Sequence, residues 1–285
     1  MVQRSRLFGA LLWVALASLW SPQVAVAGTT SAAAPASSSP VPPNRKALAQ
    51  LSSHGKEAAI AAREASAKAR EKVDAFAKAA AQSKASLKTL RASFKNHLRD
   101  GGKAYKGYQA ALRKPKATPP TDALPTAHAA YEGAVSDGAK LVEETDTLRA
   151  TEGKMADEVS GAARALDEAK AAAAECKRAS AELATLARHL SATAKKEKTD
   201  AATQAAAHAT QAAADAKKEA QEAKLAATAA GADALKARTK SGLGAPQGYA
   251  ARKARIEKED AKLKEDVAAA QKLLADVDAA SKGAT

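Results

Sequence analysis

The sequence predicts an all-α protein: an elongated antiparallel helical hairpin, or a three- or four-helix bundle, with coiled-coil seams. Alanine supplies 82 of the 285 residues, and a composition dominated by Ala, Lys, Glu, Arg and Leu is typical of long helices. Proline, which breaks helix interiors, is confined to a few clusters. Between those clusters, larger apolar residues recur every seven positions, which is the spacing of a coiled-coil core.

The first 27 residues have the form of a secretory signal peptide. Arg4 and Arg6 precede an apolar run at 7–20, and small residues follow it at the positions that a signal peptidase requires. The run is short for a membrane span of about 20 residues, so we predict cleavage and no transmembrane helix in the mature chain. The residues that define the predicted cleavage site are Ala25, Ala27 and Gly28.

Proline and glycine divide the remaining chain into helices and connections. Residues rich in Ser, Ala and Pro predict a disordered stalk, and Asn44 is the predicted N-cap of the helix that follows it. The predicted segments are a stalk at 28–44, a basic long helix at 45–114, a Pro-rich turn at 115–125, a long helix at 126–240, a Gly/Pro turn at 241–248 and a C-terminal helix and tail at 249–285. The second helix has a candidate break near 194–200.

The second long helix carries the clearest heptad seam. It runs without interruption through Leu141, Leu148, Met155, Ala162, Ala169, Cys176, Leu183 and Leu190. At 1.5 Å per residue, the first helix is a rod of about 100 Å, and an equal length from residue 126 matches it as an antiparallel hairpin. The sequence leaves open whether 199–240 folds back, and whether the seam is filled within one chain or between chains as a homo-oligomer.

The basic charge is concentrated in the first helix. The chain has a formal charge of +14, and residues 45–114 contain 17 basic and only 5 acidic residues. Two interpretations stay open: a solvated face that keeps an alanine-rich protein soluble, or a contact surface for an anionic surface component or a host protein. Nucleic acid is disfavoured because aromatic stacking residues are few. The candidate face comprises Lys84, Lys88, Arg91, Lys95, Arg99, Lys103 and Lys106.

The sequence contains no pattern of residues that predicts catalysis or a cofactor. Aromatic residues make up 3% of the chain, whereas ligand pockets are usually lined by large apolar and aromatic groups. The five histidines are not spaced to bind a metal from one helical face. Cys176, the single cysteine, lies in the heptad seam and is predicted to be a buried apolar residue, with an intermolecular disulfide as the alternative. We therefore predict a protein that is not an enzyme.

The combination of a signal peptide, a Ser/Pro/Ala stalk and long Ala/Lys/Glu helices, such as KEAAIAA at 56–62 and KEAQEAK at 218–224, resembles known families. It is similar to the helical middle domain of bacterial TolA proteins, and more so to the trypanosome surface proteins of the TolT family. This resemblance implies a non-enzymatic protein on the plasma-membrane or flagellar surface, exposed to host antibody and held by a glycolipid anchor. The chain departs from that pattern at 273–285, where no anchor signal is visible.

These observations predict a secreted or cell-surface protein. Its expected function is binding or display at the cell surface, with the basic first helix contacting an anionic host or envelope component. The alternative is a structural coat or spacer protein of the cell envelope without a specific ligand, in which length and solubility are the function.

Overall fold

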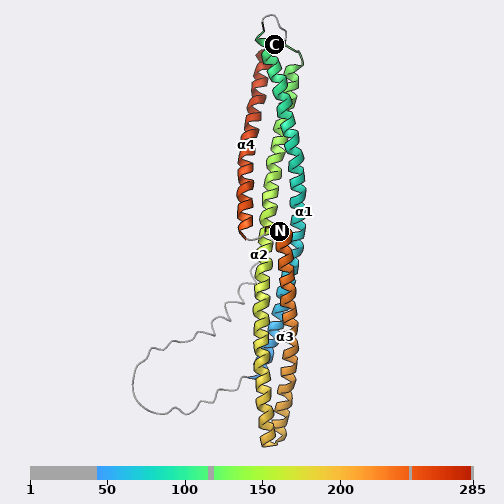
Figure 1. Ribbon diagram of the computed structural model, residues 1–285, viewed down its shortest axis with the longest axis vertical. Coiled ribbons are helices and arrows are strands. Elements are labelled where there is room, and N and C mark those ends of the chain that lie inside the picture. The colour runs from blue at the N-terminus through green and yellow to red at the C-terminus, as the bar shows by residue number, and fades with distance from the viewer. Residues whose placement is uncertain (1–43, 115–118, 244–245, 284–285) are drawn as a thin grey trace, which may run out of the picture. The chain divides into compact units, whose positions relative to one another are not determined.

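The computed structural model describes residues 44–114, 119–243 and 246–283. Across these residues the chain forms four α-helices and no strand, which confirms the predicted all-α bundle (Figure 1). The helices are α1 (Arg45–Leu112), α2 (Ala123–Glu197), α3 (Asp200–Ser241) and α4 (Pro246–Gly283). The predicted signal peptide with Ala25, Ala27 and Gly28, and the predicted stalk up to residue 43, lie outside the described residues.

Helix α1 begins at the predicted cap and buries one stripe along its whole length. The side chain of Asn44 accepts a hydrogen bond from the Lys46 N–H at 3.0 Å, which satisfies one of the amides left open at a helix start. Every seventh residue from Ser52 to Tyr108 is then buried. Those residues are Ser52, Ala59, Ser66, Val73, Ala80, Leu87, Phe94, Gly101 and Tyr108.

Helix α2 runs antiparallel to α1 and makes the predicted hairpin. Leu48 near the start of α1 shares a cluster with Leu183 near the end of α2, whereas Tyr108 near the end of α1 packs with Leu124 at the start of α2. The α2 seam residues Leu141, Leu148, Met155 and Leu183 are all buried. Leu190, the last predicted member, is only half-buried.

Residues 199–240 do fold back, which the sequence left open. Lys198 turns the chain in the left-handed region with φ 52°, and Thr199 caps α3 by accepting a hydrogen bond from the Ala202 N–H. Helix α3 then packs against α1 and α2 along one half of the hairpin, and α4 continues along the other half (Figure 1). The third helix beside α1 and α2 is therefore α3 in one half of the bundle and α4 in the other, and the last turns of α2 and the first turns of α3 extend beyond the start of α1 (Figure 1).

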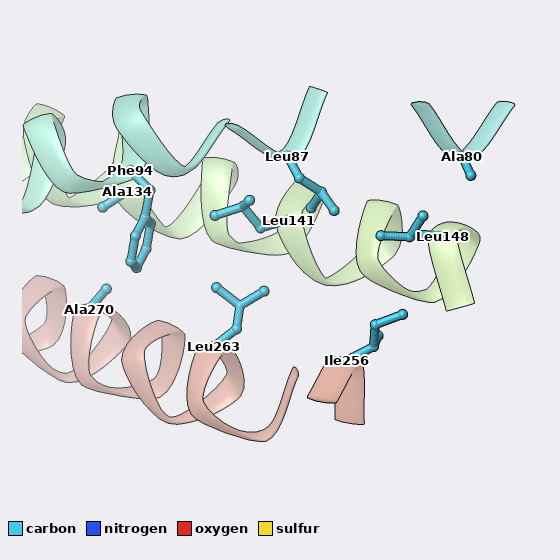
Figure 2. Packing of buried hydrophobic residues seen from close by; sticks show 9 residues of the cluster. All are labelled: Ala80, Leu87, Phe94, Ala134, Leu141, Leu148, Ile256, Leu263 and Ala270. Carbon is cyan, nitrogen blue, oxygen red and sulfur yellow. The ribbon is translucent and has the colours of Figure 1, made fainter. Parts of the chain in front are cut away.

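The two halves of the bundle differ in the size of their core residues. The α3 half is packed with small side chains, because every buried residue of α3 except Ser241 is alanine. The α4 half contains large ones, and Figure 2 shows them pointing into the space shared by α1, α2 and α4. The larger members of this cluster are Leu87, Phe94, Leu141, Leu148, Ile256 and Leu263. Since hydrophobic stabilisation scales with the apolar area buried, each core position contributed by α4 stabilises the bundle more than an alanine of α3 does.

Two helices begin three residues earlier than the sequence indicated. Helix α2 begins at Ala123 and includes Pro125, and α4 begins at Pro246 within the predicted Gly/Pro turn. Both prolines lie in a first helical turn, where the missing N–H has no intrahelical partner in any case. A Cβ on Gly248 would collide with the carbonyl oxygen of Leu243, so this close approach requires glycine.

Candidate anion-binding groove

The structure divides the predicted basic face of α1 into paired and unpaired cations. Lys84 contacts Glu152 of α2 at 2.7 Å, and Arg91 contacts Glu259 of α4 at 2.8 Å. Arg99 pairs with its neighbour Asp100 at 3.0 Å. The remaining four, Lys88, Lys95, Lys103 and Lys106, make no ion pair with a described residue. The face is therefore partly neutralised by acidic residues from other helices.

Four of the seven predicted cations line a groove of about 670 Å³ between α1 and α4. These are Lys84, Lys88, Arg91 and Lys95, while the sequence-predicted Arg99, Lys103 and Lys106 lie outside it. The α4 side contributes Arg252 and Arg255, which the sequence did not single out. Six basic and two acidic side chains thus converge on one concavity.

The groove exists because α4 packs closely against α2 and lies farther from α1. Helix α3 approaches both α1 and α2 closely, whereas the close approaches of α4 are to α2. Alanine at the buried positions of α3 permits that close packing. Leu87, Leu148 and Ile256 are larger and keep α4 farther from α1, and they form the floor of the groove.

Glu152 is a buried carboxylate at one end of the groove. Its side chain is 1% exposed, and its Oε1 lies 2.7 Å from Lys84 Nζ and 3.6 Å from Arg252 Nη1. Arg252 also donates from Nη2 to the carbonyl of Gly242, the C-cap of α3, at 2.8 Å. Arg252 therefore joins α4 to α2 and to the end of α3, next to the position where the third helix changes from α3 to α4.

Glu259, farther along the groove, accepts hydrogen bonds from two arginines, Arg91 and Arg255. Arg91 Nη2 donates to its Oε2 at 2.8 Å, and Arg255 Nε donates to its Oε1 at 3.0 Å. The hydrogen bond from Arg91 is the main cause that lowers the pKa of Glu259 below its usual value, and it outweighs the opposing effect of partial burial. Glu259 is therefore ionised throughout the neutral and mildly acidic range.

The described residues contain no cluster of side chains suited to holding a metal ion. No three His, Cys, Asp or Glu side chains among them lie close enough to hold a metal ion. His97 pairs with Asp137 at 3.1 Å and His128 with Asp278 at 3.1 Å, and these pairs are ordinary links between helices. What the groove can do chemically is attract and hydrogen-bond an anion.

Cys176 lies fully buried between α1 and α2. Its Sγ donates to the carbonyl of Ser52 at 3.2 Å and lies 3.4 Å from the Ser52 hydroxyl oxygen. The sulfur therefore has no access to a second chain in the folded bundle, which disfavours the intermolecular disulfide that the sequence left as an alternative.

Sequence reasoning missed Glu152, Arg252, Arg255 and Glu259. Glu152 follows Tyr131, Gly138 and Thr145 at seven-residue spacing, and these residues form a second buried row of α2. The heptad pattern of this row is hard to recognise in the sequence, because several of its members are polar or small rather than apolar. On α4, Arg252, Arg255 and Glu259 lie on either side of the buried Ile256, a placement that directs charged side chains along the edges of a helix interface. Their partners on α1 and α2 became visible only once the register of the helices was known.

No family model, curated protein or solved structure matches the chain. Among residues 44–114, 119–243 and 246–283, no helix combines the length and the apolar character that crossing a membrane requires.

Proposed function

We propose that this chain is a non-enzymatic protein of the cell surface or the secreted fraction, and that it binds an anionic host or envelope component through the basic side of its bundle. The observation that carries the proposal is the convergence of six basic and two acidic side chains on the groove between α1 and α4. A concave surface with one dominant sign of charge concentrates ions of the opposite sign. Placement outside the cell rests on the leader-like residues 1–27 and on the composition shared with TolT-like surface proteins.

The described residues support a binding role over a catalytic one. Catalysis needs groups of perturbed pKa held next to a site for a reacting atom. The charged groups of the groove pair with one another, as Glu152 does with Lys84 and Arg252, and the lowered pKa of Glu259 comes from such a pair. Such paired cations are suited to recognising anionic groups on a ligand.

The test compares two variants that carry the same change in charge. In the first, Lys88, Arg91, Lys95 and Arg99 of α1 are changed to Glu. In the control, two lysines and two arginines that are exposed on α2 are changed to Glu: Arg164, Lys170, Lys177 and Arg178. Retention on an immobilised sulfated polymer and on cells is measured, with circular dichroism as the check of folding.

We expect the α1 variant to lose retention and the α2 control to keep most of it. Equal losses would show that only net charge matters. Unchanged retention of both variants would contradict the proposal and favour the alternative, a coat or spacer protein without a specific ligand.

A further inference from the structure

We propose that the groove between α1 and α4 is a preorganised site for one chain of a linear sulfated polysaccharide, and that Glu152 and Glu259 are its positioning residues. This inference rests on the proposed function and goes further, because it assigns the ligand class, the two walls of the site and the role of its acidic residues.

The spacing of the cations favours a linear polymer over a small anion. Lys84, Lys88, Arg91 and Lys95 follow one another at three- or four-residue steps on α1, which extends the row over about 16 Å. Arg252 and Arg255 face this row from α4. A single phosphate or sulfate would contact only one part of this row, whereas a polymer with regularly repeated charges matches its whole length.

The lining of the groove argues against other anionic macromolecules. None of its lining residues is aromatic, so nucleobases would find no stacking surface. None of the exposed large apolar side chains of the described residues lies in it, and a membrane-bound surface usually inserts such side chains. Its large apolar members Leu87, Leu148 and Ile256 are buried, and the only exposed apolar residue of its lining is the small Ala92, so it presents little of the large apolar surface that the anchors of a peptide helix contact. A hydrophilic polyanion fits these properties.

Each acidic residue of the groove lies within ion-pair distance of one cation from each wall. Glu152 contacts Lys84 of α1 and Arg252 of α4, and Glu259 contacts Arg91 of α1 and Arg255 of α4. These contacts restrict long side chains that would otherwise lose conformational entropy on binding. A planar guanidinium fixed in this way can still donate its free N–H groups to sulfate oxygens.

Lys88 and Lys95 supply the charge that no acidic residue neutralises. Neither forms an ion pair with a described residue, and both line the groove. We therefore expect these two lysines to make the strongest direct contacts with sulfate groups. The restrained cations on either side fix the path of the polymer.

The experiment measures the affinity of the full chain for a heparin-derived oligosaccharide by isothermal titration calorimetry. For Lys88→Gln/Lys95→Gln we expect a loss of about tenfold or more, as for two lost charge-assisted hydrogen bonds. Lys170→Gln/Lys177→Gln, an equal change in charge on exposed α2 residues, is expected to stay within about twofold of the wild type. Lys103→Gln/Lys106→Gln, on α1 beyond the groove, is expected to lose less than the groove variant. All variants are checked by circular dichroism.

Glu259→Gln separates a preorganised site from simple charge attraction. This change makes the protein more basic, so attraction by net charge alone predicts tighter binding. A preorganised site predicts weaker binding by about threefold or more, because Arg91 and Arg255 lose their shared restraint. The matched control is Glu265→Gln, an exposed residue of the same helix, which we expect to bind as tightly as the wild type or slightly more tightly.

Four outcomes would overturn the inference. Glu259→Gln binding as tightly as Glu265→Gln would remove the positioning role. Equal losses in the 88/95 and 103/106 variants would place the contact on the whole α1 face, which leaves the proposed function intact. Preference for single-stranded DNA or for phosphatidylserine vesicles over the oligosaccharide would make the ligand class wrong. If the wild type binds none of these polyanions, the proposed function fails as well.

Discussion

Replacement of Leu141 by alanine tests whether the α4 half of the bundle carries the stability of the fold. Leu141 is fully buried on α2, in the same cluster as Leu87 and Phe94 of α1 and Leu263 of α4 (Figure 2). Three helices contribute to this packing, so neighbouring side chains cannot refill the vacated space without moving a whole helix. A cavity should therefore remain.

The expected cost follows from the atoms removed. Leucine to alanine deletes three carbon atoms, which is about 2.4 kcal/mol at about 0.8 kcal/mol for each buried carbon. The residual cavity adds to this value, so we expect a loss of about 3–4 kcal/mol in the free energy of unfolding. For a domain of this size, that corresponds to a fall in Tm of about 10 °C.

The measurement is unfolding in guanidinium chloride, followed by the helical circular dichroism signal, with the slope compared between variants. The control is Leu225→Ala on α3, because this leucine is 69% exposed and its loss should change stability by less than about 0.5 kcal/mol. A loss below about 1 kcal/mol for Leu141→Ala would contradict this prediction. It would mean that the three helices do not share a tightly packed core at this level.

Three further predictions concern local packing, access to the thiol and ionisation. Gly107→Ala should raise the free energy of unfolding by about 0.5–1 kcal/mol, because a Cβ there meets nothing within 4 Å and alanine favours helix. Gly55→Val should lower it by about 1–3 kcal/mol, since a Cβ there already lies 3.0 Å from the Ala172 carbonyl oxygen. Thermal unfolding of both variants tests this pair of predictions. Cys176 should react with a thiol reagent only after unfolding, and rapid labelling of the native protein would contradict its burial. The pKa of Glu259 is lower in the folded protein than in the unfolded chain, so its ionised carboxylate stabilises the fold above the unfolded pKa, and this stabilisation is lost as the pH falls through the folded pKa. An NMR titration should show that the carboxyl group of Glu259 ionises at a lower pH than that of an exposed glutamate. Equal titration midpoints for the two groups would contradict the Arg91 contact.

The fold class was readable from the sequence because heptad spacing and helix propensity are local properties. The seam from Leu141 to Leu183 is buried as its spacing predicted, since a residue repeated every seven positions stays on one face of a helix. Leu190, the last predicted member of the seam, is only half-buried. Spacing specifies which residues share a face, and it does not specify whether another helix of sufficient size covers that face.

The basic face was recognised from the sequence, but its chemistry was not. The spacing of Lys84, Lys88, Arg91 and Lys95 places them on one side of α1. Which of them are neutralised depends on Glu152 and Glu259, which lie 68 and 168 positions away from their partners in the chain. A charge pattern within one helix contains no information about the register of the helix beside it.

Composition, proline placement and apolar period by themselves determined that this protein is a bundle of long helices with a basic first helix. The division of the third helix between α3 and α4 became evident from the packing of the helices, because alanine favours helix formation without specifying a partner. The groove depends on the same level of organisation. Small core residues allow α3 to approach α1 closely, whereas larger core residues keep α4 farther from α1. The charged side chains of α1 and α4, which are distant in the sequence, then face each other across the groove.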